Sequence, residues 1–334
     1  MTKILTLGES MARLSTHSGY RLSDATQLQL HYGGAEANVA INMAQLDHDV
    51  KYATKLPKNN GLTNSLVSQL QAYAVDCSNV IYGEGRLGSY YLEVGSGLRA
   101  SNVIYDRQYS TISLMDRNEW DLDELFKDVS IFHITGVTLA LSEKWHDMGV
   151  ELIKEAKNRD IEVSFDMNYR QKMWDYDIAT TTYRKVLPHV DYLSAGHRDA
   201  IGFMGIEKIE DAEWDYYLEE ISKKYPNIQY IFGTIREAIT PNSYEMNGYI
   251  WDGTNGEGAI SKQYNNYTVI DRVGTGDSYT AAVLDGIIHD KPLKEIVEFS
   301  IAASALKHTV YGDINPFSRE EIEKFMVNKS DVNR

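Results

Sequence analysis

The chain has 334 residues and a formal net charge of -15 at pH 7, which argues against nucleic acid or an anionic membrane as its main partner. Its single cysteine, Cys77, excludes an internal disulfide and a cysteine metal cluster. No apolar run is long enough for a signal peptide or a membrane span, so we expect a cytoplasmic protein with a large buried core.

The first part of the chain alternates strand-like and helical patterns. Residues 4–7 are strand-like, and Gly33 to Asn38 opens a helix whose apolar positions keep a helical period as far as Leu46. The alternation continues with a strand at 50–53, a helix at 62–73 and a strand at 78–82. Gly33 and Gly34 either allow a ligand to approach the backbone closely or form only a tight loop.

Two β-rich segments interrupt this alternation. Residues 13–32 alternate polar and apolar side chains over short runs, and residues 90–94 and 102–105 have the pattern of a hairpin across Gly95 to Gly97. Paired in space, the segments 13–32 and 86–111 would form a small sheet that covers a site and keeps water from it. We therefore expect a β lid made of these two segments.

From residue 130 the alternation becomes regular. The predicted strands are 131–134, 161–165, 190–193 and 228–232, and the predicted helices are 143–158, 178–187 and 212–225. This pattern is typical of right-handed crossovers and a mainly parallel sheet with helices on both faces. We expect an α/β core of residues 1–12, 33–85 and 112–327, followed by a disordered tail at 328–334.

A strand, a glycine-rich loop and a helix follow one another near the C-terminus. Residues 267–270 are strand-like, Asp271 to Ser278 contains two glycines, and residues 279–288 have helical spacing. The glycines let backbone amides turn inward and form, with the helix dipole, a cradle for an oxyanion. The negative charge of Asp277 would repel a phosphate bound there. Its presence is explained if it takes a proton from an attacking hydroxyl. Alternatively, Asp277 only caps the helix.

Other motifs that could indicate a function are either absent or lie in the wrong structural setting. Gly83 to Gly88 matches a dinucleotide fingerprint by letter, but a strand-like segment follows it instead of a helix. The sequence has no P-loop and no hydrolase elbow, and its nine histidines are not at metal-ligand spacing. We therefore expect no Rossmann cofactor and no histidine metal centre.

Two stretches together resemble a known family. Gly33 to Ala40 and Asp271 to Asp277 look like the two signatures of the ribokinase-type (PfkB) sugar kinases, and the resemblance covers essentially the whole chain. It implies a ribokinase-like three-layer core, ATP with Mg²⁺ as phosphoryl donor, and a lid that often forms a dimer clasp, hence a homo-oligomer. It also implies that Asp277 is the base. The implied substrate contacts are Gly33, Gly34 and Asn38, and the implied anion hole, which also contacts ATP, is formed by Gly274, Thr275 and Gly276.

The sugar that accepts the phosphate is argued from other residues. Asp166 to Arg170 resembles the Asp-x-Asn-x-Arg motif of 2-keto-3-deoxygluconate kinases. The guanidinium of Arg170 can pair with a carboxylate in a bidentate way, and a neutral sugar has no such group. The resemblance further implies substrate contacts by Tyr90, Tyr105, Arg107 and Asp313. The alternative for Arg107 and Arg170 is a structural salt bridge to one of the many acidic residues.

Two regions depart from the family pattern. Ser194 to Asp199 takes the place of an Asn-x-x-Glu motif that organises the Mg²⁺ shell in many relatives, and Asp199 is the acid that remains for the metal. Residues 232–236 replace the more usual Gly-x-Lys-Gly nucleotide loop. Besides the glycine loop, the implied ATP contacts are Asn168, Arg170, Gly233, Thr234 and Arg236, although Arg236 can also be merely exposed to solvent.

The sequence therefore predicts a kinase that transfers the γ-phosphoryl group of ATP to the C6 hydroxyl of 2-keto-3-deoxy-D-gluconate, with Asp277 as the base. Two alternatives stay open. One is a kinase of a neutral sugar, such as fructose or ribose, on the same fold. The other is a non-catalytic sensor of a sugar acid.

Overall fold

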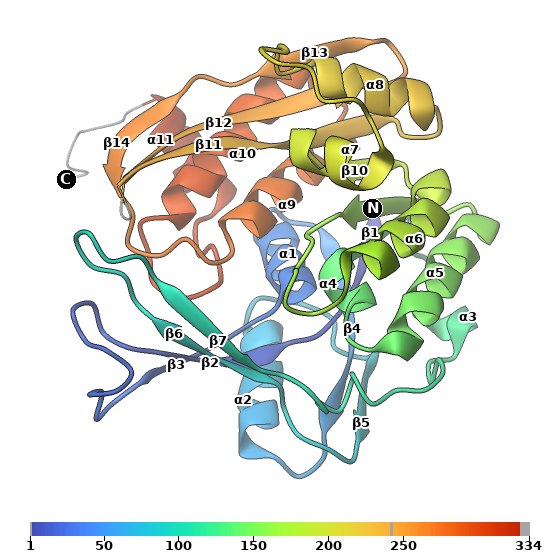
Figure 1. Ribbon diagram of the computed structural model, residues 1–334. Helices are drawn as coiled ribbons and strands as arrows, with labels where there is room; N and C mark the ends of the chain where they lie inside the picture. Colours follow the sequence, from blue (N-terminus) through green and yellow to red (C-terminus); the bar gives the residue numbers. More distant parts are fainter. Residues whose placement is uncertain (1, 241–242, 328–334) are drawn as a thin grey trace.

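One large sheet lies between two layers of helices, with a small sheet beside it, in the computed structural model, which describes residues 2–240 and 243–327 (Figure 1). The tail expected at residues 328–334 lies outside the described residues. In the described part of the chain, no helix combines the length and the apolar character that crossing a bilayer requires.

The large sheet is parallel over most of its width. Its strands are β1 (Lys3–Leu7), β4 (Asp49–Pro57), β5 (Val80–Gly83), β8 (Ile131–Thr135), β9 (Glu162–Asp166), β10 (Tyr192–Ser194), β11 (Tyr230–Thr240), β12 (Ser243–Asp252), β13 (Glu257–Ile260) and β14 (Tyr264–Thr268). Their order is β13-β12-β11-β10-β9-β8-β1-β4-β5, and β14 pairs with β12. Pairing is parallel from β5 through β11 and antiparallel around β12. The predicted mainly parallel α/β sheet is confirmed.

Helices cover both faces of the large sheet. They are α1 (Ala35–Gln45), α2 (Gly61–Ala72), α3 (Leu122–Leu125), α4 (Gly136–Leu139), α5 (Glu143–Asn158), α6 (Tyr176–Val186), α7 (His197–Met204), α8 (Tyr216–Lys224), α9 (Thr275–Ile288), α10 (Leu293–Lys307) and α11 (Arg319–Val327). A 3-10 turn at Leu187–His189 follows α6. Helices α1, α9, α10 and α11 pack together on one side, and α4 to α8 pack in succession on the other (Figure 1).

The central strand β1 is apolar on both of its sides. Ile4 belongs to the core around α1, α9 and α10, whereas Leu5 and Leu7 belong to the core around α5 and α6. All three side chains are fully buried. Successive side chains of a strand point to opposite faces, so a parallel strand between two helical layers buries every residue and carries no polar alternation.

A second, four-stranded sheet brings together the two β-rich segments. Its strands are β2 (Met11–Ser15), β3 (Gln29–Gly33), β6 (Ser89–Glu93) and β7 (Asn102–Asp106), in the order β3-β2-β6-β7. Strands β2 and β6 run parallel, and each edge strand is antiparallel to its neighbour. The predicted hairpin and its pairing with the segment 13–32 are confirmed. In Figure 1 this sheet lies at the lower left, below the layer that contains α9 and α10.

Some elements differ from their predicted bounds. Helix α5 has the bounds predicted for it, but the helix predicted at 212–225 begins only at Tyr216, because residues 205–215 form loops and turns. The strand predicted at 267–270 is observed as β14, which ends at Thr268 and pairs antiparallel with β12. The glycine-rich loop therefore follows an antiparallel strand rather than one of the parallel ones.

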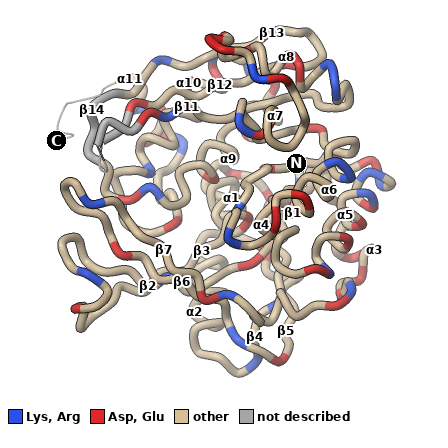
Figure 2. Tube along the Cα trace, viewed as in Figure 1, with Lys and Arg blue, Asp and Glu red and all other residues tan. Residues whose placement is uncertain are grey.

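Acidic and basic residues are mixed along the chain trace (Figure 2). The chain contains 48 acidic residues and 33 lysines and arginines, and the view in Figure 2 has no continuous basic face. That nucleic acid is not a partner stays a prediction from charge.

Candidate active site

The loop between β14 and α9 makes its turn at Gly274. This residue has φ 82° and ψ 0° and is the N-cap residue of α9. A Cβ at this position would collide with the carbonyl oxygen of Asp313, so both the backbone angles and the available space require glycine. At Gly276 a Cβ would meet open space. Gly276 therefore borders the open side of the turn.

The first amides of α9 are available to a ligand. In the part of the chain that the structure describes, no group accepts a hydrogen bond from the backbone nitrogens of Gly274, Gly276 and Asp277. The nitrogen of Thr275 lies 3.5 Å from the carbonyl oxygen of Arg272, which is long for a hydrogen bond. Helix α9 has 14 residues and its dipole is positive at this end, so these amides can bind an anion.

Asp277 lies in the first turn of α9 and contacts α1. The Nδ2 of Asn38 donates a hydrogen bond to Asp277 Oδ2 at 2.6 Å, and Asn38 Oδ1 accepts one from the backbone nitrogen of Gly34 at 3.4 Å. The N-cap residue of α9 is Gly274, and the helix has no side-chain cap, so Asp277 does not act as the helix cap. Asn38, a predicted substrate contact, holds the predicted base in this structure.

The surroundings of Asp277 favour its protonated form. Burial raises its pKa to about 7 against the effect of the hydrogen bond from Asn38, the carboxylates of Asp166 and Glu36 raise it further, and the guanidinium of Arg170 lowers it. A carboxylate whose pKa lies near neutrality is ionised in a large fraction of molecules and still binds a proton well. Asp277 is therefore suited to act as a general base.

A buried arginine joins the small sheet to the glycine loop. Arg13 Nη1 donates to Asp313 Oδ1 at 2.9 Å, and Arg13 Nη2 donates to Asp271 Oδ2. The hydroxyl of Tyr90 donates to Asp313 Oδ2. Protein groups thus engage both oxygens of Asp313, and the substrate contacts of Tyr90 and Asp313 stay predictions. No sequence pattern indicated a role for Arg13, because its partners lie 258 and 300 residues away along the chain.

The two arginines expected to recognise a carboxylate have different surroundings. Arg107 is buried, its Nε donates to Glu9 Oε2 at 2.7 Å, and its Nη1 lies 3.3 Å from the sulfur of Met173. Arg170 is exposed and forms no ion pair with any carboxylate of the described residues. A structural salt bridge is therefore observed for Arg107 and not for Arg170. The ring of Tyr105 lies beside Arg107, 5.9 Å from the guanidinium carbon to the ring centre.

Tyr105 and Arg107 line a cavity of about 650 Å³ between the small sheet and the helical layer. Its walls come from β7, from residues 140–143 at the start of α5, and from residues 172–175 ahead of α6. A cavity of this volume accommodates a small sugar. The structure thus brings two predicted substrate contacts to one cavity at the border of the small sheet.

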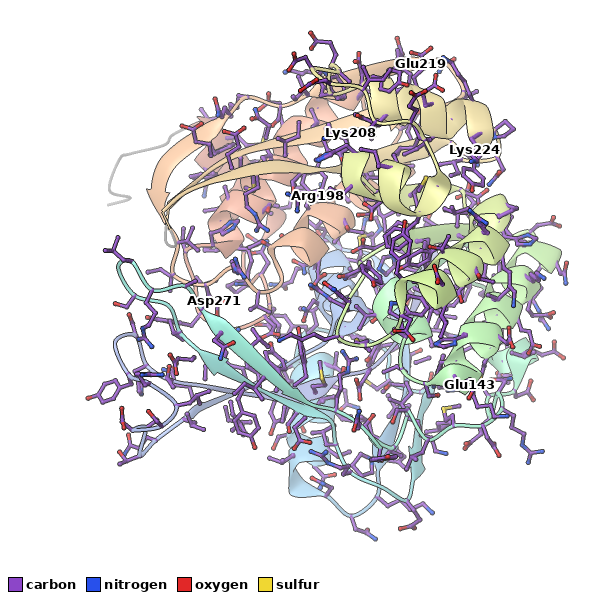
Figure 3. The ribbon with its side chains drawn as sticks, viewed as in Figure 1. Glu143, Arg198, Lys208, Glu219, Lys224 and Asp271 are labelled. Atoms are coloured by element: carbon purple, nitrogen blue, oxygen red, sulfur yellow. The ribbon has the colours of Figure 1, made fainter. Side chains whose placement is uncertain are left out.

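A second cavity, of about 960 Å³, lies at the carboxyl ends of β9 and β10 and beside residues 233–237 in the middle of β11. The predicted nucleotide and metal contacts in its wall are Asn168, Asp199, Gly233, Thr234 and Arg236. Figure 3 labels Arg198 and Lys208, two basic residues of the same wall. Open parallel sheets bind ligands at this edge. Among the described residues, Arg170 and the glycine loop are not part of this wall.

Two carboxylates of the larger cavity are suited to a divalent cation. Burial raises the pKa of Asp166 to about 6, and the charge of Asp199 adds to this effect. Burial also raises the pKa of Asp199, whose Oδ2 accepts a hydrogen bond from the backbone nitrogen of Gly196 at 2.9 Å. Mg²⁺ prefers oxygen ligands, and a cation would stabilise the ionised form of both carboxylates. The residues present therefore fit the implied Mg²⁺.

One group of three possible metal ligands lies elsewhere in the described chain, and consists of His48, Asp285 and His289. It is at the C-terminal end of α9, whereas the glycine loop is at the N-terminal end. Arg319 donates to the two oxygens of Asp285 at 2.7 and 3.0 Å. Because this guanidinium already balances the charge of Asp285, we assign no metal to the group.

Known proteins resemble this chain over nearly its whole length. A family model described as pfkB family carbohydrate kinase matches residues 1–238 and 247–320. The 2-dehydro-3-deoxygalactonokinase of Haloferax volcanii is 28% identical over 325 residues, which cover 97% of this chain and 96% of that protein. A solved PfkB family carbohydrate kinase from Listeria grayi is 42% identical, with a TM-score of 0.94 and coverage of 98% and 100% of the two chains. The solved 2-dehydro-3-deoxygluconokinase of Thermotoga maritima is 34% identical, with a TM-score of 0.93 and coverage of 98% and 100%.

Proposed function

Because the chain belongs to the pfkB family of carbohydrate kinases, we propose that it transfers the γ-phosphoryl group of ATP to the C6 hydroxyl of 2-keto-3-deoxy-D-gluconate. The placement of Asp277 carries the proposal. Burial raises the pKa of its carboxylate to about 7, Asn38 donates a hydrogen bond to it, and the amides of Gly276 and Asp277 in the same turn have no acceptor among the described residues. Transfer of a phosphoryl group to an alcohol needs a base beside an anion cradle.

In the proposed reaction, Asp277 accepts the proton of the attacking hydroxyl while the new oxygen–phosphorus bond forms and ADP leaves. The amides from Gly274 to Asp277 donate hydrogen bonds to the phosphoryl oxygens, where negative charge increases during transfer. Asn38 fixes the direction of the Asp277 carboxylate, and its donated hydrogen bond favours the ionised form that can act as a base.

The larger cavity is the proposed ATP site. It has room for a nucleotide, and Gly233, Thr234 and Arg236 lie in its wall. Asp166 and Asp199 are the residues that would hold Mg²⁺, which supplies positive charge to the phosphate oxygens when it is bound.

The choice of an acidic sugar depends on Arg170. Its guanidinium is exposed, has no carboxylate partner among the described residues, and lies close enough to lower the pKa values of Asp166 and Asp277. A substrate carboxylate would supply the partner that Arg170 lacks. The names of two relatives support an acid, since one is a 2-dehydro-3-deoxygalactonokinase and the other a 2-dehydro-3-deoxygluconokinase.

A kinase of a neutral sugar is the second candidate, and one observation favours it. Arg107, the other arginine expected to recognise a carboxylate, is already paired with Glu9. A sugar acid would therefore meet one available arginine instead of two, unless Arg107 changes partner.

We also propose that the small sheet, from the segments 13–32 and 86–111, is a lid on the core formed by residues 1–12, 33–85 and 112–327. Support comes from Tyr105 and Arg107, which the sheet contributes to the smaller cavity. The same sheet exposes the apolar side chains of Leu30 and Ile104. A second copy of the chain that covers them would explain this exposure.

A substrate panel tests the proposed reaction. Release of ADP is measured with 2-keto-3-deoxygluconate, its galactonate-derived epimer, fructose, ribose and adenosine, and we expect the highest kcat/KM for 2-keto-3-deoxygluconate. A higher value for fructose or ribose would replace the proposal with the neutral-sugar candidate. Binding of the acid in calorimetry without any release of ADP would identify a sensor.

Replacement of Arg170 tests how the acid is recognised. Arg170→Met should lower kcat/KM for the acid by about tenfold to a hundredfold, since a hydrogen bond between charged groups contributes about 1.5–3 kcal/mol. For fructose or ribose the change should stay below about threefold. Arg184→Met is the matched control, because Arg184 is an exposed arginine on α6 that is in the wall of neither cavity. Equal losses for acidic and neutral sugars would assign Arg170 a structural role.

A further inference from the structure

A fully buried charge cluster lies between the small sheet and the glycine loop. The side chains of Arg13, Asp271 and Asp313 are only 1%, 4% and 3% exposed. Burying an ion costs several kcal/mol of stability, unless the geometry of its neighbours balances its charge and satisfies its hydrogen bonds. The two terminal nitrogens of Arg13 meet this condition, since each donates to one carboxylate, whereas its buried Nε has no acceptor among the described residues.

The carboxylate of Asp271 holds the backbone on both sides of the glycine turn. Asp271 Oδ1 accepts from the nitrogen of Val273 at 3.0 Å, and its Oδ2 accepts from the nitrogen of Gly312 at 3.1 Å. The carbonyl oxygen of Asp313 occupies the space that a Cβ of Gly274 would need. The segment ending at Asp313 thus packs directly against the turn whose amides form the cradle. Figure 3 labels Asp271 at the border between this loop and the small sheet.

The arginine itself belongs to the small sheet. Arg13 lies in the middle of β2, and its register partner in β6 is Tyr90, whose hydroxyl donates to Asp313. Two adjacent strands of the small sheet therefore contact the same carboxylate. Through this cluster, the position of the small sheet and the shape of the glycine turn depend on each other.

We propose that Arg13 is a positioning residue for phosphoryl transfer, which acts by holding Asp271 and Asp313 together and so keeps the glycine turn in the shape of an anion cradle. The inference rests on the proposed role of the glycine turn and not on the identity of the sugar. It assigns the small sheet a part in the chemical step, through β2, besides any role in covering the substrate.

A buried lysine beside the cluster does not replace the arginine. Lys307 is buried nearby, but its Nζ donates to the carbonyl oxygen of Val310 at 3.3 Å. An ammonium group at position 13 would be a point charge without the planar fork that reaches two separate carboxylates. Without the guanidinium, the carboxylates of Asp271 and Asp313 would repel each other, and the two segments that carry them would separate.

The test compares Arg13→Met and Arg13→Lys with Arg319→Met. Arg319 also donates to a buried carboxylate through two nitrogens, but at the other end of α9, so its loss reproduces the general cost of an unpaired buried acid. We expect Arg13→Met to lower kcat by about a hundredfold or more with changes below about threefold in the KM for ATP and for the sugar, as for loss of geometry at the reacting centre. Arg13→Lys should recover less than a tenth of the lost kcat. Arg319→Met should lower the melting temperature and leave kcat within about threefold of the wild type.

Arg13→Met alone can fail to fold, so Arg13→Met/Asp271→Asn is measured beside it. This double variant removes one charge of each sign and leaves Asp313 with the hydrogen bond from Tyr90. We expect it to fold and to keep the low kcat of the arginine variant, because the bonds that shape the turn are still missing. A double variant with wild-type kcat, or an Arg13→Met enzyme whose kcat matches that of Arg319→Met, would overturn the inference.

The sugar used in these measurements is whichever one the wild-type enzyme phosphorylates fastest in the panel. If that sugar is neutral, the proposed substrate is wrong, but the comparison of Arg13 with Arg319 remains valid. If the arginine variants change KM and not kcat, the proposed substrate stands and the positioning role is wrong.

Discussion

Asp277 is the residue whose protonation should govern the rate at acidic pH. Its pKa is raised to about 7 by burial, and the base must be ionised before the hydroxyl attacks. We therefore expect kcat/KM to rise about tenfold per pH unit below pH 7 and to level off above it. The measurement is the pH profile of ADP release at saturating ATP.

Asn38 supplies a direct check on that assignment. Its hydrogen bond lowers the pKa of Asp277, so Asn38→Leu should move the acidic limb of the profile to higher pH. Asn42→Leu is the control, because Asn42 lies one turn further along α1 and donates to the carbonyl oxygen of Asn38 instead. If the acidic limb keeps its position in Asn38→Leu, the limb does not report the ionisation of Asp277.

At the scale of single residues, what could be predicted depended on whether the signal was local. The glycine turn and Asp277 lie within a few residues of each other, so their spacing alone indicates an anion cradle with a base. Arg13 and Asp313 are 300 residues apart, and an arginine in an alternating strand pattern gives no indication of its partner. The pairing of Arg107 with Glu9 spans 98 residues and was not identifiable for the same reason.

At the scale of elements, the two glycines of the turn before α9 differ in whether their positions tolerate a side chain. Gly274 has positive φ and no space for a Cβ, so Gly274→Ala should destabilise the protein by at least about 1–3 kcal/mol and abolish activity. Gly276→Ala should leave stability within about 0.5 kcal/mol, because a Cβ there meets open space, yet it should lower kcat by narrowing the cradle. Thermal melting and ADP release measure the two effects. Equal melting temperatures for the two variants would contradict the described turn.

Helices with a strong periodic pattern could be predicted, whereas the buried α10 and the short α7 could not. Helix α5 has one buried and one exposed face, so its sequence carries a clear helical period and its predicted bounds are the observed ones. In α10 the residues from Ser300 to Ala305 are all buried, which removes the polar face that a period requires. Helix α7 has only eight residues and begins directly after Gly196, and so offers too short a window for a periodic signal.

At the scale of the whole molecule, the exposed apolar side chains of the small sheet lead us to predict a dimer. Leu30 and Ile104, on its two edge strands, are 44% and 50% exposed, and we expect a second copy to cover them. Light scattering should give about twice the 37.9 kDa mass of one chain for the wild type. Leu30→Glu/Ile104→Glu should give a single chain, and Leu62→Glu, which replaces an exposed leucine on α2, should not change the mass. A monomeric wild type would exclude this interface.

The architecture of the whole molecule could be predicted because it depends on the order of elements rather than on individual contacts. Alternating strands and helices allow few topologies other than a parallel sheet with helices on both faces. The antiparallel extension by β12 and β13 was not predicted. Antiparallel strands can follow one another without an intervening helix, so the alternation of strands and helices that indicated the other strands is absent there. The two cavities depend on how loops from separate crossovers meet, which the order of elements does not determine.

The replacement Asp277→Asn measures most directly whether this carboxylate is the base. The folded state raises the pKa of Asp277 from 3.8 to about 7, so the ionised form is the less stable one and stability decreases as pH rises between these values. At pH 8, Asp277→Asn should therefore melt at a temperature no lower than the wild type and bind ATP with a similar Kd. Its kcat should fall by about a thousandfold or more, at the upper part of the range for a lost general base. A variant that folds, binds ATP and keeps its kcat within about tenfold of the wild type would show that the proton goes elsewhere.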